Sequence, residues 1–211
     1  MKVLLFNGSP RKSGCTFTAL SLAAEVLNAE GIETEIIWIG SKPVGGCTAC
    51  RACAKLGKCA FDDIVNEVRE KCCEADGFIF GSPVHFGALT GNMTSFMDRL
   101  FYSELLGNKN AAFALKPAAA VISARRAGTT TAVAQMMNYF LIRSMPVITT
   151  RYWPVVHGTS PEEVMQDHEG VHSIRSVAAN MAFFLKCKQA GLDSGSPLPV
   201  TEPHPQTNFI R

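Results

Sequence analysis

Short apolar runs, each ended by glycine, proline or polar residues, alternate with segments of helical periodicity along most of this 211-residue chain. Five runs are predicted strands: 2–7, 33–39, 77–81, 117–123 and 146–150. The periodic segments are predicted helices: 16–30, 61–73, 90–106, 130–143 and 171–187. Strands and helices that alternate in this way form a parallel sheet covered by helices on both faces. We therefore expect one α/β domain over residues 1–191, followed by a Pro/Ser/Gly-rich arm over 192–211.

The composition excludes several classes of protein. Hydrophobic residues make up 47% and charged residues 18% of the chain, which argues against disorder. With 20 Lys and Arg against 18 Asp and Glu, the chain lacks the basic excess of a nucleic-acid-binding protein. No apolar run approaches the roughly 20 residues that span a membrane. The apolar run at 3–6 is too short for a secretory signal, so a cytoplasmic location is expected.

The turn between the first predicted strand and the first predicted helix has the composition of an anion site. It carries hydroxyls and cations: Ser9, Arg11, Lys12, Ser13 and Thr16. Ligands in such sheets bind beyond the carboxyl ends of the strands, and a helix N-terminus adds partial positive charge. The glycine spacing matches neither a dinucleotide fingerprint nor a Walker loop. A phosphate site is expected here, with a simple polar turn as the alternative.

The turn that follows the third predicted strand suits a flat ligand. Pro83 fixes the backbone, while Gly87 and Gly91 allow close approach. His85 and Phe86 can flank an aromatic ring. The alternative is an ordinary Gly/Pro turn with one buried aromatic side chain.

Four of the eight cysteines form a compact motif with the spacing C-x2-C-x2-C-x5-C: Cys47, Cys50, Cys53 and Cys59. Closely spaced thiolates of this kind suit a [4Fe–4S] cluster, although the last gap differs from that of the bacterial ferredoxin run. Zinc is less natural, because structural zinc sites usually pair two knuckles across a longer spacer. A reversible thiol/disulfide switch and reduced thiols in an intersubunit loop are the alternatives. The histidines show no metal-binding spacing.

Three segments in the expected order resemble the NAD(P)H-dependent FMN reductase family. The Gly-Ser-Pro-Arg turn within 8–16 resembles its phosphate loop. Segments 82–87 and 91–99 resemble its flavin-ring loop and the helix that follows, and 167–182 resembles its last helix. The cysteine motif resembles that of the iron–sulfur flavoproteins, a branch of the same flavodoxin-like superfamily.

The resemblance implies a flavodoxin-like fold of strand order 2-1-3-4-5, with FMN as cofactor and a homodimer or homotetramer. It places the FMN phosphate on Ser9, Arg11, Ser13, Cys15 and Thr16. It places the ring against Pro83, Val84, His85, Phe86 and Gly87. The loop with Ser123, Arg125, Arg126 and Gly128 is expected to border the pyrimidine side, where an arginine stabilises negative charge on the reduced flavin. Both arginines can instead be solvated or pair with a neighbouring subunit.

These expectations lead to an FMN-dependent oxidoreductase that passes electrons from NAD(P)H through FMN to a small-molecule or protein acceptor. No side chain is expected to act as an acid or base. The first alternative is an iron–sulfur flavoprotein that transfers electrons through a [4Fe–4S] cluster on the four cysteines. The second is a non-catalytic, flavin-binding redox sensor.

Two further sets of residues are interpreted as structural. Asp98 and Arg99 are expected to form a helix-surface or interface ion pair. Aromatic residues near the fifth predicted strand are expected in the core or at a subunit contact: Tyr139, Phe140, Tyr152 and Trp153.

Overall fold

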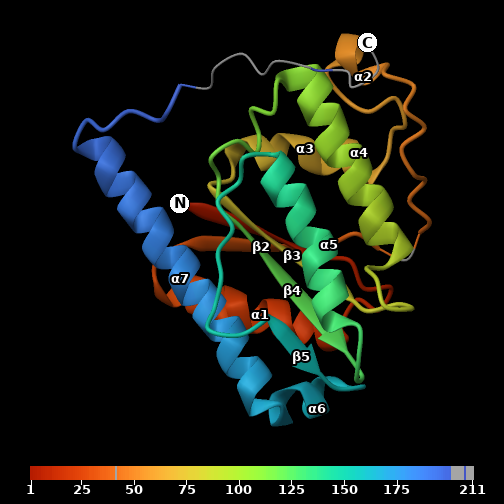
Figure 1. The fold of residues 1–211 in the computed structure, drawn as a ribbon, viewed down its shortest axis with the longest axis vertical. Coiled ribbons are helices and arrows are strands. Elements are labelled where there is room, and N and C mark those ends of the chain that lie inside the picture. Colours follow the sequence, from red (N-terminus) through yellow and green to blue (C-terminus); the bar gives the residue numbers. More distant parts are fainter. Residues whose placement is uncertain (41, 201–206, 208–211) are drawn as a thin grey trace.

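Five parallel strands end at one edge of a sheet in the computed structural model, which describes residues 1–40, 42–200 and 207 (Figure 1). The elements follow in the order β1 Lys2–Asn7, α1 Cys15–Ala29, β2 Glu33–Trp38, α2 Cys53–Leu56, α3 Ile64–Glu74, β3 Gly77–Pro83, α4 Gly91–Asn108, β4 Ala118–Ala124, α5 Thr129–Ile142, β5 Val155–His157, α6 Pro161–Gln166 and α7 His168–Asp193. The strand carboxyl ends meet at the lower right of Figure 1.

The strand order is β2-β1-β3-β4-β5, with all pairs parallel, which confirms the predicted topology. β1 lies between β2 and β3, and its Val3 is in register with Thr34 and Gly77. The sequence order reverses direction between β1 and β3, because β2 lies on one side of β1 and all later strands lie on the other. Such a reversal opens a crevice at the carboxyl ends of the strands, where ligands of this fold bind.

Helices cover both faces of the sheet and enclose two apolar cores (Figure 1). On one face, α3, α4 and α5 pack on the side chains of Leu4, Phe6, Phe78 and Phe80. On the other face, α1, α6 and α7 pack on alternate residues of the same strands, such as Leu5. Successive strand side chains point to opposite faces, so strands buried on both sides read as continuous apolar runs.

The fifth strand lies later in the chain than predicted. Val147, in the predicted strand at 146–150, makes only an isolated bridge to Ala118 at the start of β4. The chain then leaves the sheet and returns as β5, which pairs with Ile122–Ala124 at the end of β4. The prediction was wrong because the apolar run at 146–148 is the stronger local signal, while β5 is only three residues long.

Several helix boundaries also differ from the predictions. α3 begins at Ile64 rather than residue 61, because the Asp63 side chain accepts a hydrogen bond from the Val65 N–H and caps the helix. α2 and α6 are short additional helices. α7 extends to Asp193, two residues past the expected domain boundary. The expected arm at 192–211 stays a prediction, and its residues 201–206 and 208–211 lie outside the described part of the chain.

No helix in the described ranges is long and apolar enough to cross a bilayer.

Candidate functional site

The turn between β1 and α1 is held in shape by its own polar groups. Asn7 is fully buried; its Oδ1 accepts from the Ser9 N–H at 3.0 Å, and its Nδ2 donates to the Lys12 carbonyl at 3.1 Å. The Ser9 Oγ accepts from the Arg11 N–H at 3.1 Å. The Trp38 indole N–H donates to the Ser9 carbonyl at 2.8 Å and ties this turn to β2. The backbone of the turn is therefore fixed before any ligand arrives.

The N-terminus of α1 opens into a cleft of ≈ 360 Å³. Its N-cap is Gly14, no described side chain caps the helix, and its first turn contains no acidic residue. The first N–H groups of the helix therefore keep their hydrogen-bonding capacity and partial positive charge. Arg11 lines the cleft beside them, which adds a full positive charge. This arrangement suits a phosphate or another anion.

The cleft gathers residues from four loops that are far apart in the sequence. Its walls are Ser9, Pro10, Arg11, Gly14, Cys15, Thr16, Pro83, Val84, His85, Ser123, Ala124, Arg125, Gly158 and Thr159. A second hollow of ≈ 310 Å³ is lined by Val84, Phe86, Gly87, Ala124, Arg125, Arg126 and Ala127. The two hollows adjoin, because they share Val84, Ala124 and Arg125. Two predicted binding residues line neither hollow: Ser13 and Gly128.

Buried hydroxyls join the walls of the first hollow. The Thr16 and Ser123 hydroxyls lie 2.8 Å apart, and each residue is at most 2% exposed. This contact fixes the start of α1 against the end of β4. The Val84 N–H donates to the Ser123 carbonyl at 2.9 Å and holds the loop after β3 in the same place.

The loop after β3 makes a tight turn that presents Phe86 to solvent. The His85 and Ala88 backbones exchange hydrogen bonds of 2.9 and 3.1 Å. Phe86 and Gly87 between them have φ of 50° and 79°, as the two central residues of a type I′ turn require. The Phe86 side chain is fully exposed. A bulky residue in this backbone conformation is strained, and its ring contacts little of its own chain.

Gly128 supports this turn from the next loop, although it does not line either hollow. It has φ of 88° and is the N-cap residue of α5. A Cβ placed here would lie 2.9 Å from both the Gly87 Cα and the Val84 Cγ1. Only glycine lets the two loops approach so closely.

Sequence reasoning missed Gly158 and Thr159, which line the first hollow directly after β5. The Cys15 thiol donates to the Gly158 carbonyl at 3.5 Å, so the predicted residue Cys15 does face the cleft wall. Burial raises the pKa of this thiol, which keeps it protonated as a weak donor. The sequence would have pointed to Gly158 and Thr159 only if the fifth strand had been predicted at 155–157.

The four cysteines of the motif line one small cavity at a different place, beside α4: Cys47, Cys50, Cys53 and Cys59. None of the eight cysteines, all of which lie in the described residues, forms a disulfide. Cys47 and Cys50 lie on an exposed segment, whereas Cys53 is buried at the start of α2. The Ala52 N–H and the Thr48 hydroxyl hold the pKa of Cys50 below its usual range, while burial raises the pKa of Cys53.

α4 positions the cysteine loop through a close contact at its end. A Cβ on Gly107 would lie 2.9 Å from the Cys53 carbonyl oxygen and the Gly57 Cα. The Asn108 side chain donates to the Gly57 carbonyl at 2.9 Å. α2 therefore rests directly on the backbone of α4, and this contact places Cys53 at the cavity.

The four cysteines match the ligand types of an iron–sulfur cluster. Within the described residues, no three His, Cys, Asp or Glu side chains converge closely enough to hold one metal ion. Four cysteine sulfurs around a shared cavity are the ligand set of a [4Fe–4S] cluster. The cavity measures only ≈ 20 Å³, about the space of one water molecule, so the four sulfurs would have to lie farther apart to hold a cluster.

The expectation that Asp98 and Arg99 form a surface or interface ion pair was wrong. The Arg99 side chain is only 1% exposed and pairs with Asp63 at 2.6 Å, whereas Asp98 accepts a hydrogen bond from the Tyr139 hydroxyl at 2.5 Å. Arg99 also lines the cysteine cavity. Local sequence gave no signal of this role, because the partner Asp63 is 36 residues away.

Known proteins resemble this chain in sequence and in fold. A family model described as NADPH-dependent FMN reductase matches residues 1–160. An iron–sulfur flavoprotein of Methanocaldococcus jannaschii is 36% identical over 194 residues, which are 88% of this chain and 98% of that protein. An iron–sulfur flavoprotein of Archaeoglobus fulgidus is 33% identical over 187 residues, covering 86% of this chain and 90% of that protein.

Two solved structures share the fold at low sequence identity. RosB with a bound 8-demethyl-8-formylriboflavin-5′-phosphate intermediate has a TM-score of 0.69 at 19% identity, covering 100% of this chain and 94% of RosB. The NAD(P)H:quinone oxidoreductase of Methanothermobacter marburgensis has a TM-score of 0.67 at 15% identity, covering 86% of this chain and 96% of that protein. These likenesses show a flavodoxin-like fold. The sequence matches show that the chain belongs to the family of NADPH-dependent FMN reductases and iron–sulfur flavoproteins, which are oxidoreductases.

Proposed function

We propose that this chain binds FMN in the two adjoining hollows and uses it to pass electrons from NAD(P)H to a small-molecule or protein acceptor. The observation that carries the proposal is the uncapped N-terminus of α1, which opens beside Arg11 into a cleft bordered by the turn after β3. The phosphate would bind at α1, and the ring would lie along the loops with Val84 and Arg125.

Bound FMN would supply hydride acceptance and electron donation, which no side chain provides. The chain's residues would bind and orient it. The N–H groups at the start of α1, with Arg11, would neutralise the phosphate charge. The Thr16–Ser123 contact and the bond from Val84 to Ser123 would fix the ring loop against the phosphate loop. The exposed Arg125 and Arg126 would stabilise negative charge near the ring.

The phosphate position is tested by FMN titration of Arg11→Ala. Loss of this cation is expected to weaken FMN binding at least tenfold, about 1.4 kcal/mol. Lys12→Ala is the matched control. Lys12 is the neighbouring cation, but it does not line the cleft, and its Nζ lies 5.8 Å from the Trp38 ring centroid. We expect this control to bind FMN within about twofold of the wild type. Tight stoichiometric FMN in Arg11→Ala, or equal losses in both variants, would contradict the assignment.

The electron donor is tested by steady-state oxidation of NADH and of NADPH by the FMN-loaded protein, with free flavin, quinones and ferric chelates as acceptors. Turnover with either nucleotide supports the oxidoreductase. Stoichiometric FMN without turnover in any combination would favour the redox sensor instead.

A second candidate function is electron transfer through a [4Fe–4S] cluster, favoured by the cavity that the four cysteines line. The iron–sulfur flavoproteins named above support it. Iron and acid-labile sulfide are measured in anaerobically purified protein, with zinc as a control. About four irons and four sulfides per chain, lost in Cys53→Ala, are expected. Their absence from protein produced with ample iron removes this candidate and favours the thiol/disulfide switch.

A further inference from the structure

Arg99 uses every hydrogen-bond donor of its guanidinium at the cysteine cavity. Nε donates to the Cys59 Sγ at 3.3 Å. Nη1 donates to the Gly45 carbonyl at 3.4 Å and to Asp63 at 2.6 Å, and Nη2 donates to the Phe61 carbonyl at 3.0 Å and to Asp63 at 2.9 Å. A guanidinium has five N–H groups, so none is left over. The bidentate pair with Asp63 fixes the plane of the group, and its Nε–H is directed at sulfur.

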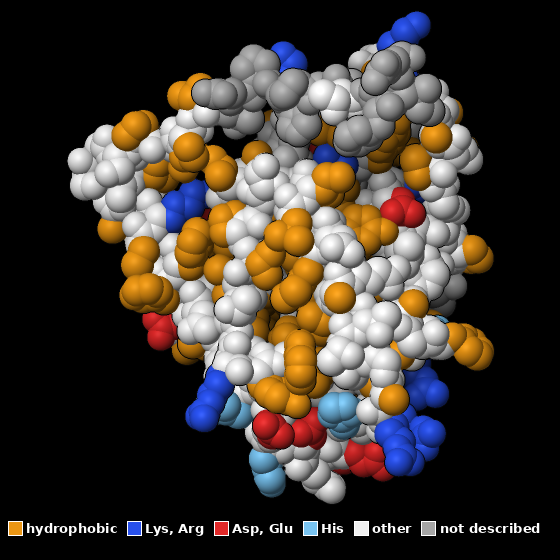
Figure 2. Space-filling model, viewed as in Figure 1, with side chains coloured by type: hydrophobic (Ala, Val, Ile, Leu, Met, Phe, Trp, Pro, Cys, Tyr) orange, Lys and Arg blue, Asp and Glu red, His pale blue; other side chains and the backbone are white. Residues whose placement is uncertain are grey.

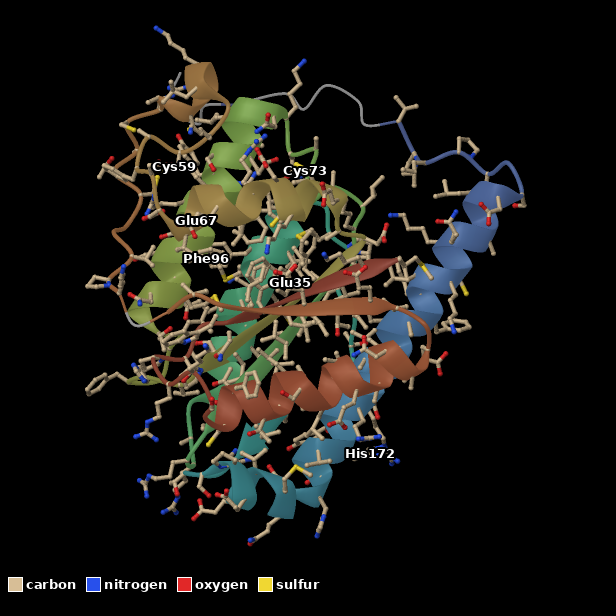
Figure 3. The ribbon with its side chains drawn as sticks, turned by 180° about the vertical axis from the view of Figure 1, so that it is seen from behind. Glu35, Cys59, Glu67, Cys73, Phe96 and His172 are labelled. Atoms are coloured by element: carbon tan, nitrogen blue, oxygen red, sulfur yellow. The ribbon has the colours of Figure 1, made fainter. Side chains whose placement is uncertain are left out.

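Cys59 is also the most firmly held of the four cysteines. Its N–H donates to the Asn66 Oδ1 at 3.1 Å, and its carbonyl accepts from the Asn66 Nδ2 at 3.0 Å. Asn66 belongs to α3, whereas Arg99 belongs to α4. Figure 3 labels Cys59 in the loop that precedes α3. Cys47 and Cys50 are exposed, and the contacts of the Cys50 thiol come from its own segment, through the Ala52 N–H and the Thr48 hydroxyl. Cys53 and Cys59 are therefore anchored by neighbouring helices, whereas Cys47 and Cys50 lie on an exposed segment.

We propose that Arg99 is a positioning residue for the cluster of the proposed function, where it holds Cys59 in place and, by donating its Nε–H to the sulfur, raises the reduction potential of the cluster. The inference rests on that proposed cluster. Hydrogen bonds to cysteine sulfurs and nearby charge are established determinants of cluster potentials. Reduction of the cluster by one electron, which the flavin of the proposed function would supply, would form and break no bond. A buried cation and a donor at sulfur stabilise the added negative charge.

The test is a redox titration of Arg99→Lys and Arg99→Gln, followed by electron paramagnetic resonance of the reduced cluster. Arg99→Lys keeps a cation but loses the Nε–H donor, so we expect the equilibrium constant for cluster reduction to fall about tenfold, or about 59 mV for one electron. Arg99→Gln also loses the charge, so the equilibrium constant for cluster reduction should fall further. The flavin potential, read in the same titration, should stay unchanged, because the two hollows contain no part of Arg99.

Asp63→Asn keeps Arg99 and should shift the cluster potential in the opposite direction from the Arg99 variants. It takes away the carboxylate that compensates the guanidinium, so the cluster potential should rise. Arg69→Gln is the structural control. Arg69 lies 2.6 Å from the buried Glu104 and also joins α3 to α4, but it makes no hydrogen bond to a cysteine among the contacts of the described residues. It should leave the cluster potential unchanged in molecules that retain iron.

The outcomes separate this inference from the proposed function. Wild-type protein without iron and sulfide removes the cluster and the role of Arg99 together. Wild-type protein with a cluster, but with the same potential in Arg99→Lys and Asp63→Asn, overturns the role of Arg99 and leaves the cluster standing. An equal potential shift in Arg69→Gln also overturns it, because the effect would then arise from general disturbance of the α3–α4 contact.

Discussion

Phe86 combines a strained backbone conformation with a fully exposed side chain. Its φ of 50° disfavours a bulky L-residue, and its full exposure leaves no burial to compensate. Asn-Gly is the preferred centre of a type I′ turn. We therefore expect Phe86→Asn to raise the free energy of unfolding of the FMN-free protein by about 0.5–1 kcal/mol, measured by urea denaturation.

The same substitution is expected to weaken FMN binding in the titration described above, because the ring that borders the second hollow is removed. A fall in the free energy of unfolding would mean that Phe86 already makes a stabilising contact, for example with a second subunit. Unchanged FMN affinity would mean that Phe86 does not touch the flavin.

Contacts between elements are tested at Gly128, where the N-cap of α5 meets the turn after β3. Gly128→Ala would place a methyl group 2.9 Å from Gly87 and Val84 on a backbone of positive φ. We expect a loss of about 1–3 kcal/mol in the free energy of unfolding and weaker FMN binding, because the ring loop must move. Gly91→Ala is the control, since its methyl group would meet no atom within 4 Å. Equal effects of both substitutions would contradict this account.

A second junction of elements lies at Asp167, between β5 and α7. Its Oδ1 accepts from the Gly170 N–H at 2.9 Å and caps α7, while its Oδ2 accepts from the His157 N–H at 2.7 Å. Asp167→Ala removes both bonds and should cost about 1–3 kcal/mol. Asp167→Asn keeps one carbonyl acceptor, so an intermediate loss is expected in the same urea denaturation.

FMN affinity should follow the same order at this junction, because Gly158, the residue after His157, lines the first hollow. Loss of stability in Asp167→Ala without any change in FMN affinity would show that β5 does not position the cleft.

The whole molecule presents a group of hydrophobic side chains over α5 and the loop that follows it (Figure 2). Exposed members are Leu141, Ile142, Tyr152 and Trp153, and a hollow of ≈ 380 Å³ lies among residues 148–154 and Met137. Phe140 is buried in the core instead, and the partly buried Tyr139 packs against that core. Exposed apolar patches of this kind are typical of subunit contacts. We therefore propose that the predicted homo-oligomer forms through this surface.

Ile142→Glu is expected to dissociate the oligomer, measured as molar mass by light scattering, while FMN remains bound. Phe183→Glu is the matched control, because Phe183 is also 71% exposed but lies on α7. Dissociation by Phe183→Glu alone would assign the interface to α7, and a monomeric wild type would contradict the oligomer itself.

Local sequence by itself determined the first four strands, the five longer helices, the parallel sheet and the two turns that flank the first hollow, because apolar periodicity and turn residues act between near neighbours. Tertiary structure alone decided the position of β5, and with it Gly158 and Thr159, because pairing with β4 outweighed the stronger apolar run before it. It also decided that Arg99 is buried against Asp63 and Cys59. Contacts across tens of residues depend on packing that no local pattern encodes.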